Sequence, residues 1–400
     1  MKRISRLENL QESVIREMTR YSMEYDAINL SQGLPDFSPP SQLIDSLKRA
    51  INDDYHQYSV TWGLKELRDK ISEKMRRFNG LDYNAETDIT VTCGTSEAIM
   101  SAIFSVVNSG DRVVLIEPVY ENYIPAVRFA DGIAVPVSTE LFTGKIDEEG
   151  MKEAFEQNPA AIVVNSPLNP SGKVFSVDEM KFMADLCEDH DVIAITDEIY
   201  EYIIYEGKHT SLASIGDMYG RTITTGGFSK TFSVTGWRVG YAAADKELSG
   251  QLRKVHDYLT VCAPTPFQKA LVDALDMPES YYTDMLKSYR KKRNFLYNSL
   301  KNHGFLPIMP EGAYYMLADF SEIYESNNIS SVNTEHSEKD FAFAEYLVKN
   351  IGVASVPGSS FYTPEHSEIG RNFIRFSFAR TMESLFEVDR RFDSLQNDMV

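Results

Sequence analysis

Lys230 is the residue whose setting in this sequence most strongly indicates chemistry. It lies in the segment Gly-Gly-Phe-Ser-Lys-Thr (226–231), which directly follows a β-branched run at 221–225. A lysine at the end of a buried strand can lose its proton and become an amine nucleophile that forms a Schiff base with a carbonyl compound. A lone lysine is usually a solvated surface residue. Lys230 is not alone, because Arg238 follows eight residues later.

Other predicted strand ends supply complementary groups. Gly94, Thr95 and Ser96 stand where a helix should begin, and the free N–H groups of a helix start can bind a phosphate. Tyr120 could stack on a flat ring, although a single tyrosine is more often a packing residue. Asp197 would be desolvated and needs a cationic or N–H partner, which a structural salt bridge could equally provide. A phosphate anchor, a flat ring, a buried carboxylate and an amine nucleophile together describe a site for pyridoxal phosphate.

Short apolar runs that alternate with helical stretches must position these groups. The runs lie at 89–93, 112–116, 160–165, 191–196, 221–225 and 240–244. Such runs between helices are typical of a parallel sheet buried on both faces, so we expect a doubly wound α/β domain. Ligands bind these sheets at the carboxyl ends of the strands, where the polar segments fall. Ser176 and Glu179 form a capping box that predicts the start of one helix.

The two ends of the chain have a different character. One face of a predicted N-terminal helix carries the apolar residues Leu7, Leu10, Val14 and Met18. Beyond about residue 280 the regular alternation fades, and 372–379 has the alternation of a strand. We therefore expect a smaller α+β domain that combines both ends. The expected division is 1–45 as the N-terminal arm and part of the small domain, 46–280 as the large domain and 281–400 as the small C-terminal domain.

Composition excludes several classes of protein. The 400 residues carry 40 basic and 59 acidic side chains, and a net charge of −19 disfavours binding to nucleic acid or to an anionic membrane. The three cysteines lie far apart, which excludes a disulfide scaffold and indicates a reducing compartment. No apolar run is long enough for a membrane span or placed as in a signal peptide, so we expect a soluble, cytoplasmic protein. We assign no metal site.

Across nearly its whole length the chain resembles the class I/II aminotransferases of fold type I, which are pyridoxal-phosphate enzymes. Residues 169–172 (Asn-Pro-Ser-Gly) are similar to the N-P-[ST]-G motif of that family, and residues 197–200 (Asp-Glu-Ile-Tyr) to its D-E-x-Y motif. Residues 229–232 (Ser-Lys-Thr-Phe), followed by 236–240 (Gly-Trp-Arg-Val-Gly), match its lysine motif. Motifs in this order and at this spacing are highly specific.

The resemblance implies a role for each matching residue of the cofactor site. Lys230 would hold the cofactor aldehyde as a Schiff base and then carry a proton between the substrate Cα and the cofactor. Asp197 would pair with the protonated pyridine nitrogen. Tyr120 would stack on the cofactor ring, and Asn169 and Tyr200 would hydrogen-bond its phenolic oxygen. The phosphate would be bound by Thr95, Ser96 and Arg238. Many relatives have a further phosphate ligand, a serine, at the position of Gly227, so phosphate binding would rest on the remaining donors, with Ser229 among them.

Substrate and partner contacts are implied in the same way. Arg375 matches the arginine that grips the substrate α-carboxylate in a bidentate fork, which lysine could not reproduce. Asn169 and the backbone N–H of Gly33 would assist at the substrate. Tyr58 matches the tyrosine that reaches the partner's phosphate across a dimer interface, so a homodimer is implied.

The expected reaction is the ping-pong transfer of an amino group between an L-amino acid and a 2-oxo acid. Prokaryotic aspartate-type relatives often have lysine at the position of Ser96. The segments 28–37, 94–98 and 373–379 look closer to the kynurenine-, glutamine- and methionine-type members. We therefore expect neutral or aromatic amino donors.

Three alternatives remain open. Aspartate aminotransferase is one, because another residue could supply the missing positive charge. A β C–S lyase is the second, because it uses the same lysine, ring and carboxylate. The third is a ligand-sensing regulator, which would carry a DNA-binding module ahead of this domain. Only 32 residues precede Gly33 and Arg375 favours turnover, so we expect an enzyme.

Overall fold

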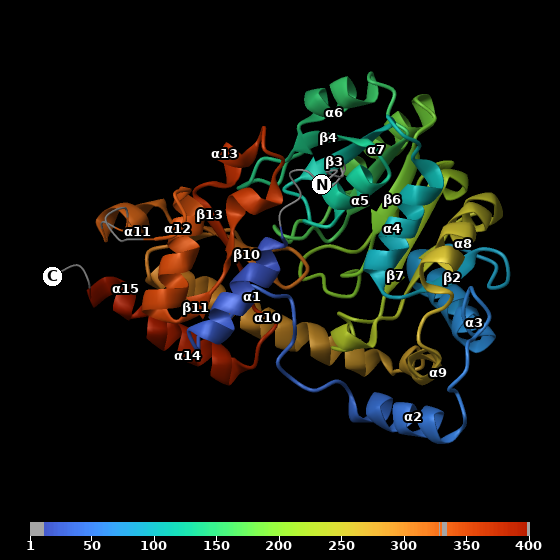
Figure 1. Ribbon diagram of the computed structural model, residues 1–400, viewed down its shortest axis with the longest axis horizontal. Coiled ribbons are helices and arrows are strands. Elements are labelled where there is room, and N and C mark those ends of the chain that lie inside the picture. Colours follow the sequence, from blue (N-terminus) through green and yellow to red (C-terminus); the bar gives the residue numbers. More distant parts are fainter. Residues whose placement is uncertain (1–11, 328, 330–333, 398–400) are drawn as a thin grey trace, which may run out of the picture.

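A seven-stranded sheet is the centre of the larger part of the molecule (Figure 1). The computed structural model describes residues 12–327, 329 and 334–397. The strands lie in the order β2-β8-β7-β6-β5-β3-β4. Their bounds are β2 Ile89–Thr92, β3 Arg112–Glu117, β4 Ile133–Ser138, β5 Ala161–Asn165, β6 Ile193–Asp197, β7 Thr222–Gly227 and β8 Gly240–Ala243. Strand β8 runs antiparallel to its neighbours β2 and β7, and all other pairs are parallel, so the sheet is mostly parallel, as predicted.

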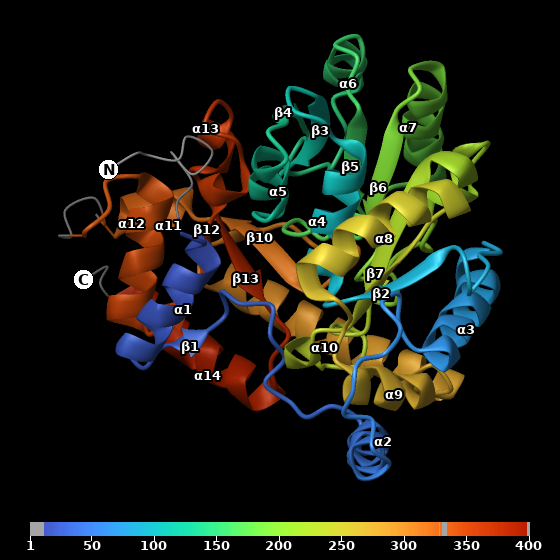
Figure 2. The ribbon, with the colours of Figure 1, turned by 45° about the vertical axis from the view of Figure 1, so that its right-hand side comes forward.

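Helices cover both faces of this sheet, because the side chains of each strand alternate between two apolar clusters. Val113 and Leu115 pack with helices α4, α5 and α8, whereas Val114 and Ile116 pack with α6 and α7. Figure 2 shows α8 lying across the sheet. The bounds of the helices in this part are α2 Ser41–Asn52, α3 Lys65–Lys74, α4 Thr95–Val106, α5 Tyr123–Phe129, α6 Glu148–Phe155, α7 Val177–Asp189, α8 Lys246–Thr260 and α9 Thr265–Ala274.

The predicted start of α7 is confirmed. The Ser176 hydroxyl accepts the Glu179 N–H, and the Glu179 carboxylate accepts the Ser176 N–H, which is a complete capping box.

Both ends of the chain form the smaller part, an α+β unit. A four-stranded antiparallel sheet in the order β12-β13-β10-β9 lies beside a short parallel pair, β1 and β11. Helix α1 lies along β11 (Figure 1). The bounds are α1 Val14–Glu24, β1 Ile28–Asn29, α10 Glu279–Asn302, β9 Leu306–Pro307, β10 Tyr315–Asp319, α11 Ser321–Ser326, α12 Lys339–Tyr346, β11 Val353–Ala354, β12 Val356–Pro357, α13 Ser367–Gly370, β13 Phe373–Ser377, α14 Met382–Phe392 and α15 Ser394–Asn397.

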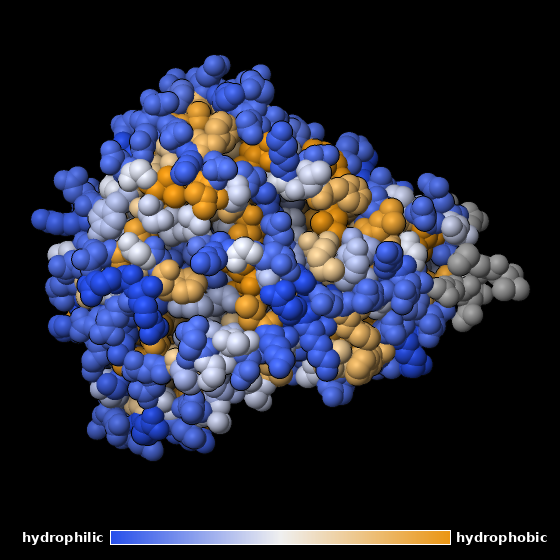
Figure 3. All heavy atoms as spheres, turned by 180° about the vertical axis from the view of Figure 1, so that it is seen from behind, coloured by the Kyte–Doolittle hydropathy of each residue, from blue (hydrophilic) through white to orange (hydrophobic). Residues whose placement is uncertain are grey.

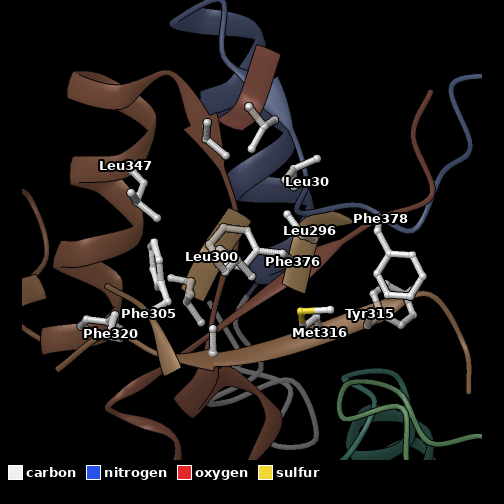
Figure 4. Packing of buried hydrophobic residues seen from close by; sticks show 14 of the residues in the cluster. Leu30, Leu296, Leu300, Phe305, Tyr315, Met316, Phe320, Leu347, Phe376 and Phe378 are labelled. Carbon is white, nitrogen blue, oxygen red and sulfur yellow. The ribbon is translucent and has the colours of Figure 1, made fainter. Parts of the chain in front are cut away.

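The core of this smaller part joins residues that are far apart in the sequence. Leu30 from the N-terminal segment packs in one cluster with Leu296, Leu300 and Phe376 (Figure 4). Met18 is fully buried in the same cluster, as its position on the predicted apolar face requires. Leu7 and Leu10, which were predicted on the same apolar face as Met18, lie outside the described residues.

Two features of the large sheet differ from the sequence prediction. Strand β4 was not predicted, because it is an edge strand whose exposed and buried residues alternate and which contains Pro136. The direction of β8 was not predicted either, because an apolar run carries no information on strand direction. Because β8 is antiparallel, its beginning lies at the edge where the other strands end.

One face of the molecule is mainly polar. The face seen in Figure 3 is largely hydrophilic, with small apolar patches. Among the described helices, none is both long enough and apolar enough to cross a membrane.

Candidate active site

A cavity of about 640 Å³ lies at the carboxyl ends of the parallel strands. Residues that follow β2, β3, β5, β6 and β7 line it, together with residues that precede the antiparallel β8. The sequence-predicted residues among them are Gly33, Thr95, Ser96, Tyr120, Asn169, Asp197, Tyr200, Ser229, Lys230 and Arg238. Arg375 borders the cavity through its contacts with Asn169 and Tyr315. Tyr58 does not line the cavity of its own chain, and its side chain is exposed.

The Lys230 amine is held inside this cavity by neutral groups. Its Nζ donates to the Gly33 carbonyl oxygen at 3.1 Å and lies within 6 Å of the ring centroids of Tyr200 and Tyr314. Burial lowers the pKa of the Lys230 ammonium group, because the charged form loses its hydration. The amine is therefore closer to its neutral, nucleophilic form than a surface lysine.

Asp197 is a buried carboxylate at the end of β6. Its Oδ2 accepts the Tyr123 hydroxyl at 2.7 Å, and its Oδ1 accepts the Ile199 N–H at 3.2 Å. Burial raises the pKa of Asp197 to about 6, and the two hydrogen bonds oppose that shift. A cation placed against this carboxylate would favour its ionised form.

Positive charge lies at the start of α4. A methyl group added to Gly94 would come within 2.5 Å of the Arg238 guanidinium, which places this arginine against the first turn of α4. Arg238 has a left-handed backbone with φ of 53°, a costly conformation for a residue other than glycine, and it donates one hydrogen bond to the Thr235 carbonyl. None of the described carboxylates forms an ion pair with it. The helix start and Arg238 thus form an anion site.

Three hydroxyl side chains near this anion site, those of Thr95, Ser96 and Ser229, differ in hydrogen bonding and in exposure. The Thr95 hydroxyl donates to the Gly226 carbonyl at 3.1 Å, so its proton points away from the cavity. Ser96 is exposed and Ser229 is buried at the cavity wall. A Cβ on Gly227 would lie 2.8 Å from the Thr95 oxygen, so Thr95 occupies the space that a serine at 227 would need.

Arg375 on β13 forms a second cationic site and is fully buried. It donates to the Asn169 side-chain oxygen at 2.9 Å and to the Ser31 carbonyl, and its guanidinium stacks on Tyr315 at 4.3 Å from the ring centroid. Its Nε has no partner among the described residues. None of the described carboxylates forms an ion pair with this buried guanidinium, and one of its N–H donors is unused. Arg375 is therefore suited to bind the carboxylate of a substrate.

Gly33 is needed at its position because Tyr315 packs directly against it. A Cβ on Gly33 would lie 1.8 Å from the Tyr315 hydroxyl oxygen, which itself hydrogen-bonds the Tyr200 hydroxyl at 3.0 Å. The Gly33 carbonyl also accepts the Tyr314 hydroxyl at 3.0 Å. The residue therefore lies at the contact between Lys230 and a group of tyrosines.

We expect Gly33→Ala to displace Tyr315 and to lower catalytic activity by at least about tenfold, with a loss of about 1–3 kcal/mol in unfolding free energy. Steady-state kinetics and denaturant unfolding would measure the two effects. Gly250→Ala is the matched control, because nothing lies within 4 Å of a Cβ at that helical position, and it should be neutral or slightly stabilising. Wild-type activity in Gly33→Ala would contradict this packing argument.

Sequence reasoning missed two tyrosines that complete the site. Tyr123 follows Tyr120 by three residues and begins α5, and its position shortly after a strand end was the available signal. Tyr315 begins a strand of the other part of the molecule, and nothing in its local sequence indicates that it reaches Tyr200.

The charged groups of the cavity match the groups of pyridoxal 5′-phosphate. A phosphate would find Arg238 and the start of α4, a protonated ring nitrogen would find Asp197, and an aldehyde would find the Lys230 amine. Arg238, Asp197 and Lys230 would each thereby gain a partner of complementary chemistry, and Arg375 would remain for the substrate. The fold and the site define a pyridoxal-phosphate enzyme of fold type I.

Comparison with known proteins gives the family. The model of the aminotransferase class I and II family matches residues 25–391, and the chain belongs to this family. It is 34% identical to a kynurenine–oxoglutarate transaminase of Dictyostelium discoideum over 92% of this chain and 90% of that protein. It is 35% identical to a probable aspartate aminotransferase of Methanocaldococcus jannaschii, with 95% and 96% covered. A solved structure of an Escherichia coli protein with a methionine aminotransferase function matches with a TM-score of 0.89, 30% identity, and 98% and 100% covered.

The protein is therefore a pyridoxal-phosphate-dependent aminotransferase, whose substrates are amino acids and 2-oxo acids.

Proposed function

We propose that the chain moves an amino group from an L-amino acid to a 2-oxo acid in a ping-pong cycle, with Lys230 as the catalytic amine. One observation carries this proposal. The half-buried amine of Lys230 shares one cavity with a buried carboxylate, Asp197, and a buried guanidinium, Arg375, borders that cavity. That arrangement suits a substrate that carries a carboxylate next to an amine.

Each residue would have a separate task in this cycle. Bound pyridoxal phosphate supplies an electron sink next to the substrate α-carbon. Asp197 would hold a proton on the ring nitrogen, and Lys230, which attaches the cofactor at rest, would move a proton from the substrate Cα to the carbon that becomes the amine-bearing carbon of the cofactor. Burial lowers the pKa of Lys230, which favours the neutral amine that accepts this proton. The remaining contacts would be Tyr120 on the ring, Asn169 and Tyr200 on the phenolic oxygen, and Thr95, Ser96, Ser229 and Arg238 on the phosphate.

Arg375 would bind the substrate α-carboxylate, with the Gly33 N–H and Asn169 beside it. We expect Arg375→Lys to lower kcat/KM by about 100-fold, because an ammonium group cannot form the two parallel hydrogen bonds of a guanidinium. The loss should be much smaller for an amine substrate that lacks the carboxylate. Equal losses for both substrates, measured in the half-reaction that consumes the amine, would argue against this assignment.

We propose neutral or aromatic amino acids as donors. Ser96 supplies no charge where aspartate-type relatives often have lysine, and Leu34, Ile99, Met100 and Phe129 add apolar surface to the cavity. Relatives named for kynurenine and methionine agree with this proposal, while the relative named for aspartate keeps that donor as the alternative. A panel of phenylalanine, methionine, glutamine and aspartate with 2-oxoglutarate tests it. Strong preference for aspartate would refute it.

A β C–S lyase is a separate alternative, since it would use the same lysine and carboxylate. Release of pyruvate from cystathionine without any 2-oxo acid acceptor would identify it. Strict dependence of turnover on an acceptor supports the aminotransferase.

We also propose a homodimer in which Tyr58 completes the phosphate site of the partner subunit. Exposed apolar residues lie on the loop of Tyr58 and at the end of α8, namely Val60, Tyr258, Leu259 and Val261. The Thr61 hydroxyl donates to the Asp257 carboxylate at 3.4 Å, which brings that loop to the end of α8. The loop of Tyr58 is fixed to its own chain by the bond from the Thr265 hydroxyl to the Gln57 carbonyl at 2.7 Å. Tyr58 does not line the cavity of its own chain, and exposed apolar side chains lie beside it. Both features support a subunit interface at this place.

For the domains we propose the division at residues 45 and 280. Helix α2 begins at Ser41, and the long helix α10 begins at Glu279. Limited proteolysis that released a stable fragment with other bounds would argue against this division.

A further inference from the structure

Arg16 is a cation in the cavity wall that the cofactor and the substrate α-carboxylate leave unused. It lies in the first turn of α1, and its side chain is exposed and lines the cavity together with Gln32 and Tyr315. Among the described residues no carboxylate forms an ion pair with its guanidinium, and no acceptor takes a hydrogen bond from it. The neighbouring acid on the same face, Glu12, is paired with Arg20 instead.

The start of α1 fixes Arg16 over the cavity. The Ser13 hydroxyl accepts the Arg16 N–H at 3.3 Å and donates to the carboxylate of Glu121, which also lines the cavity. Ile15 is buried in an apolar cluster with Phe361, and Tyr120 packs against that cluster. The helix start is thereby attached to the segment that follows β3. A cation in the first turn of a helix opposes the helix dipole, so this placement costs free energy unless an anion binds there.

The charges that line the cavity can be assigned by elimination. Among the described residues they are Arg16, Glu121, Asp197, Lys230 and Arg238. The cofactor uses the last three, and Glu121 accepts the Ser13 hydroxyl. Arg375 at the border is used by the substrate α-carboxylate. Arg16 is then the cation that remains for a second negative group of a substrate.

We propose that Arg16 binds the distal carboxylate of a dicarboxylic 2-oxo acid, which makes it a specificity-determining residue for the amino acceptor. This inference rests on the proposed aminotransferase function. A guanidinium on an exposed side chain can pair with a carboxylate when a dicarboxylate is bound, and it can turn toward water when a neutral side chain takes its place. The same cavity can therefore accept a neutral amino donor and an acidic acceptor in turn.

The ratio of kcat/KM for 2-oxoglutarate to kcat/KM for pyruvate, with one fixed amino donor, tests the proposal. We expect this ratio to fall by about tenfold or more in Arg16→Gln and to recover largely in Arg16→Lys. Arg20→Gln is the matched control, because it removes an exposed arginine of the same helix that does not line the cavity, and its ratio should equal that of the wild type. Calorimetry on the cofactor-loaded protein adds a binding readout, in which Arg16→Gln should weaken glutarate more than butyrate.

Two outcomes separate this inference from the proposed function. If the wild type releases a 2-oxo acid from amino donors and Arg16→Gln leaves both the kinetic ratio and the glutarate preference unchanged, the role of Arg16 is wrong while the aminotransferase stands. If the wild type transfers no amino group to any 2-oxo acid, the proposed function itself fails.

Discussion

Lys230→Ala should lose transamination almost completely, by more than about 10⁴-fold, because the substitution removes both the attachment point of the cofactor and the group that moves the proton. Borohydride reduction of the wild type should fix the cofactor permanently to the peptide that contains Lys230. The same treatment of the variant should leave the chain unmodified. Mass spectrometry of the reduced and digested protein, together with steady-state kinetics, measures both effects.

Lys292 supplies the control for this experiment. It is the other described lysine whose pKa burial lowers, to about 8, and its ammonium group lies over the ring of Phe37 outside the cavity. Lys292→Ala should keep the borohydride-fixed cofactor. Attachment at Lys292 in the wild type, or turnover at the wild-type rate in Lys230→Ala, would contradict the assignment of Lys230.

Asp197→Asn should lower the transamination rate by about 10²–10³-fold, because a neutral amide no longer stabilises a proton on the ring nitrogen. The same substitution should stabilise the cofactor-free protein at neutral pH. The pKa of Asp197 in the folded state, about 6, lies above its ordinary value of 3.8, so the folded chain binds more protons between these two values. The unfolding free energy of the wild type therefore falls as pH rises from about 4 to about 6, and it stays lower above that. Asparagine does not ionise and avoids this loss.

Thermal unfolding of the cofactor-free proteins checks the sign of this effect. The advantage of Asp197→Asn over the wild type should be present at pH 7 and absent at pH 4. Asp340→Asn is the matched control, because burial also raises the pKa of Asp340, which lies away from the cavity. It should shift stability with pH in the same direction but leave the transamination rate unchanged. An Asp197→Asn variant with the wild-type rate would contradict the role of this carboxylate.

The groups that follow strands were predictable, because position relative to a buried parallel strand fixes where a side chain will lie. Asp197 and Lys230 each come at or just after the end of a strand, and the structure brings both to one cavity. Contacts between the two parts of the molecule were not predictable. Tyr315 reaches Tyr200 across 115 positions of sequence, and only the antiparallel pairing of β10 with β13 sets it beside Arg375.

The direction of β8 had a functional consequence that no apolar pattern could reveal. Because this strand runs antiparallel to β7, Arg238 precedes it at the edge where β7 ends, which places the guanidinium at the start of α4. Arg16 was overlooked for a different reason. An arginine in an amphipathic N-terminal helix resembles any solvated residue until the fold shows that the helix start lies over the cavity.

The most direct measurement of the central claim follows nitrogen from donor to acceptor. The cofactor-loaded protein would be supplied with ¹⁵N-labelled phenylalanine or methionine and unlabelled 2-oxoglutarate, and the products would be analysed by mass spectrometry. We expect the label to appear in glutamate, and we expect at most one equivalent of 2-oxo acid per site when the acceptor is omitted. Label recovered as free ammonium, with turnover that continues in the absence of an acceptor, would contradict the aminotransferase mechanism.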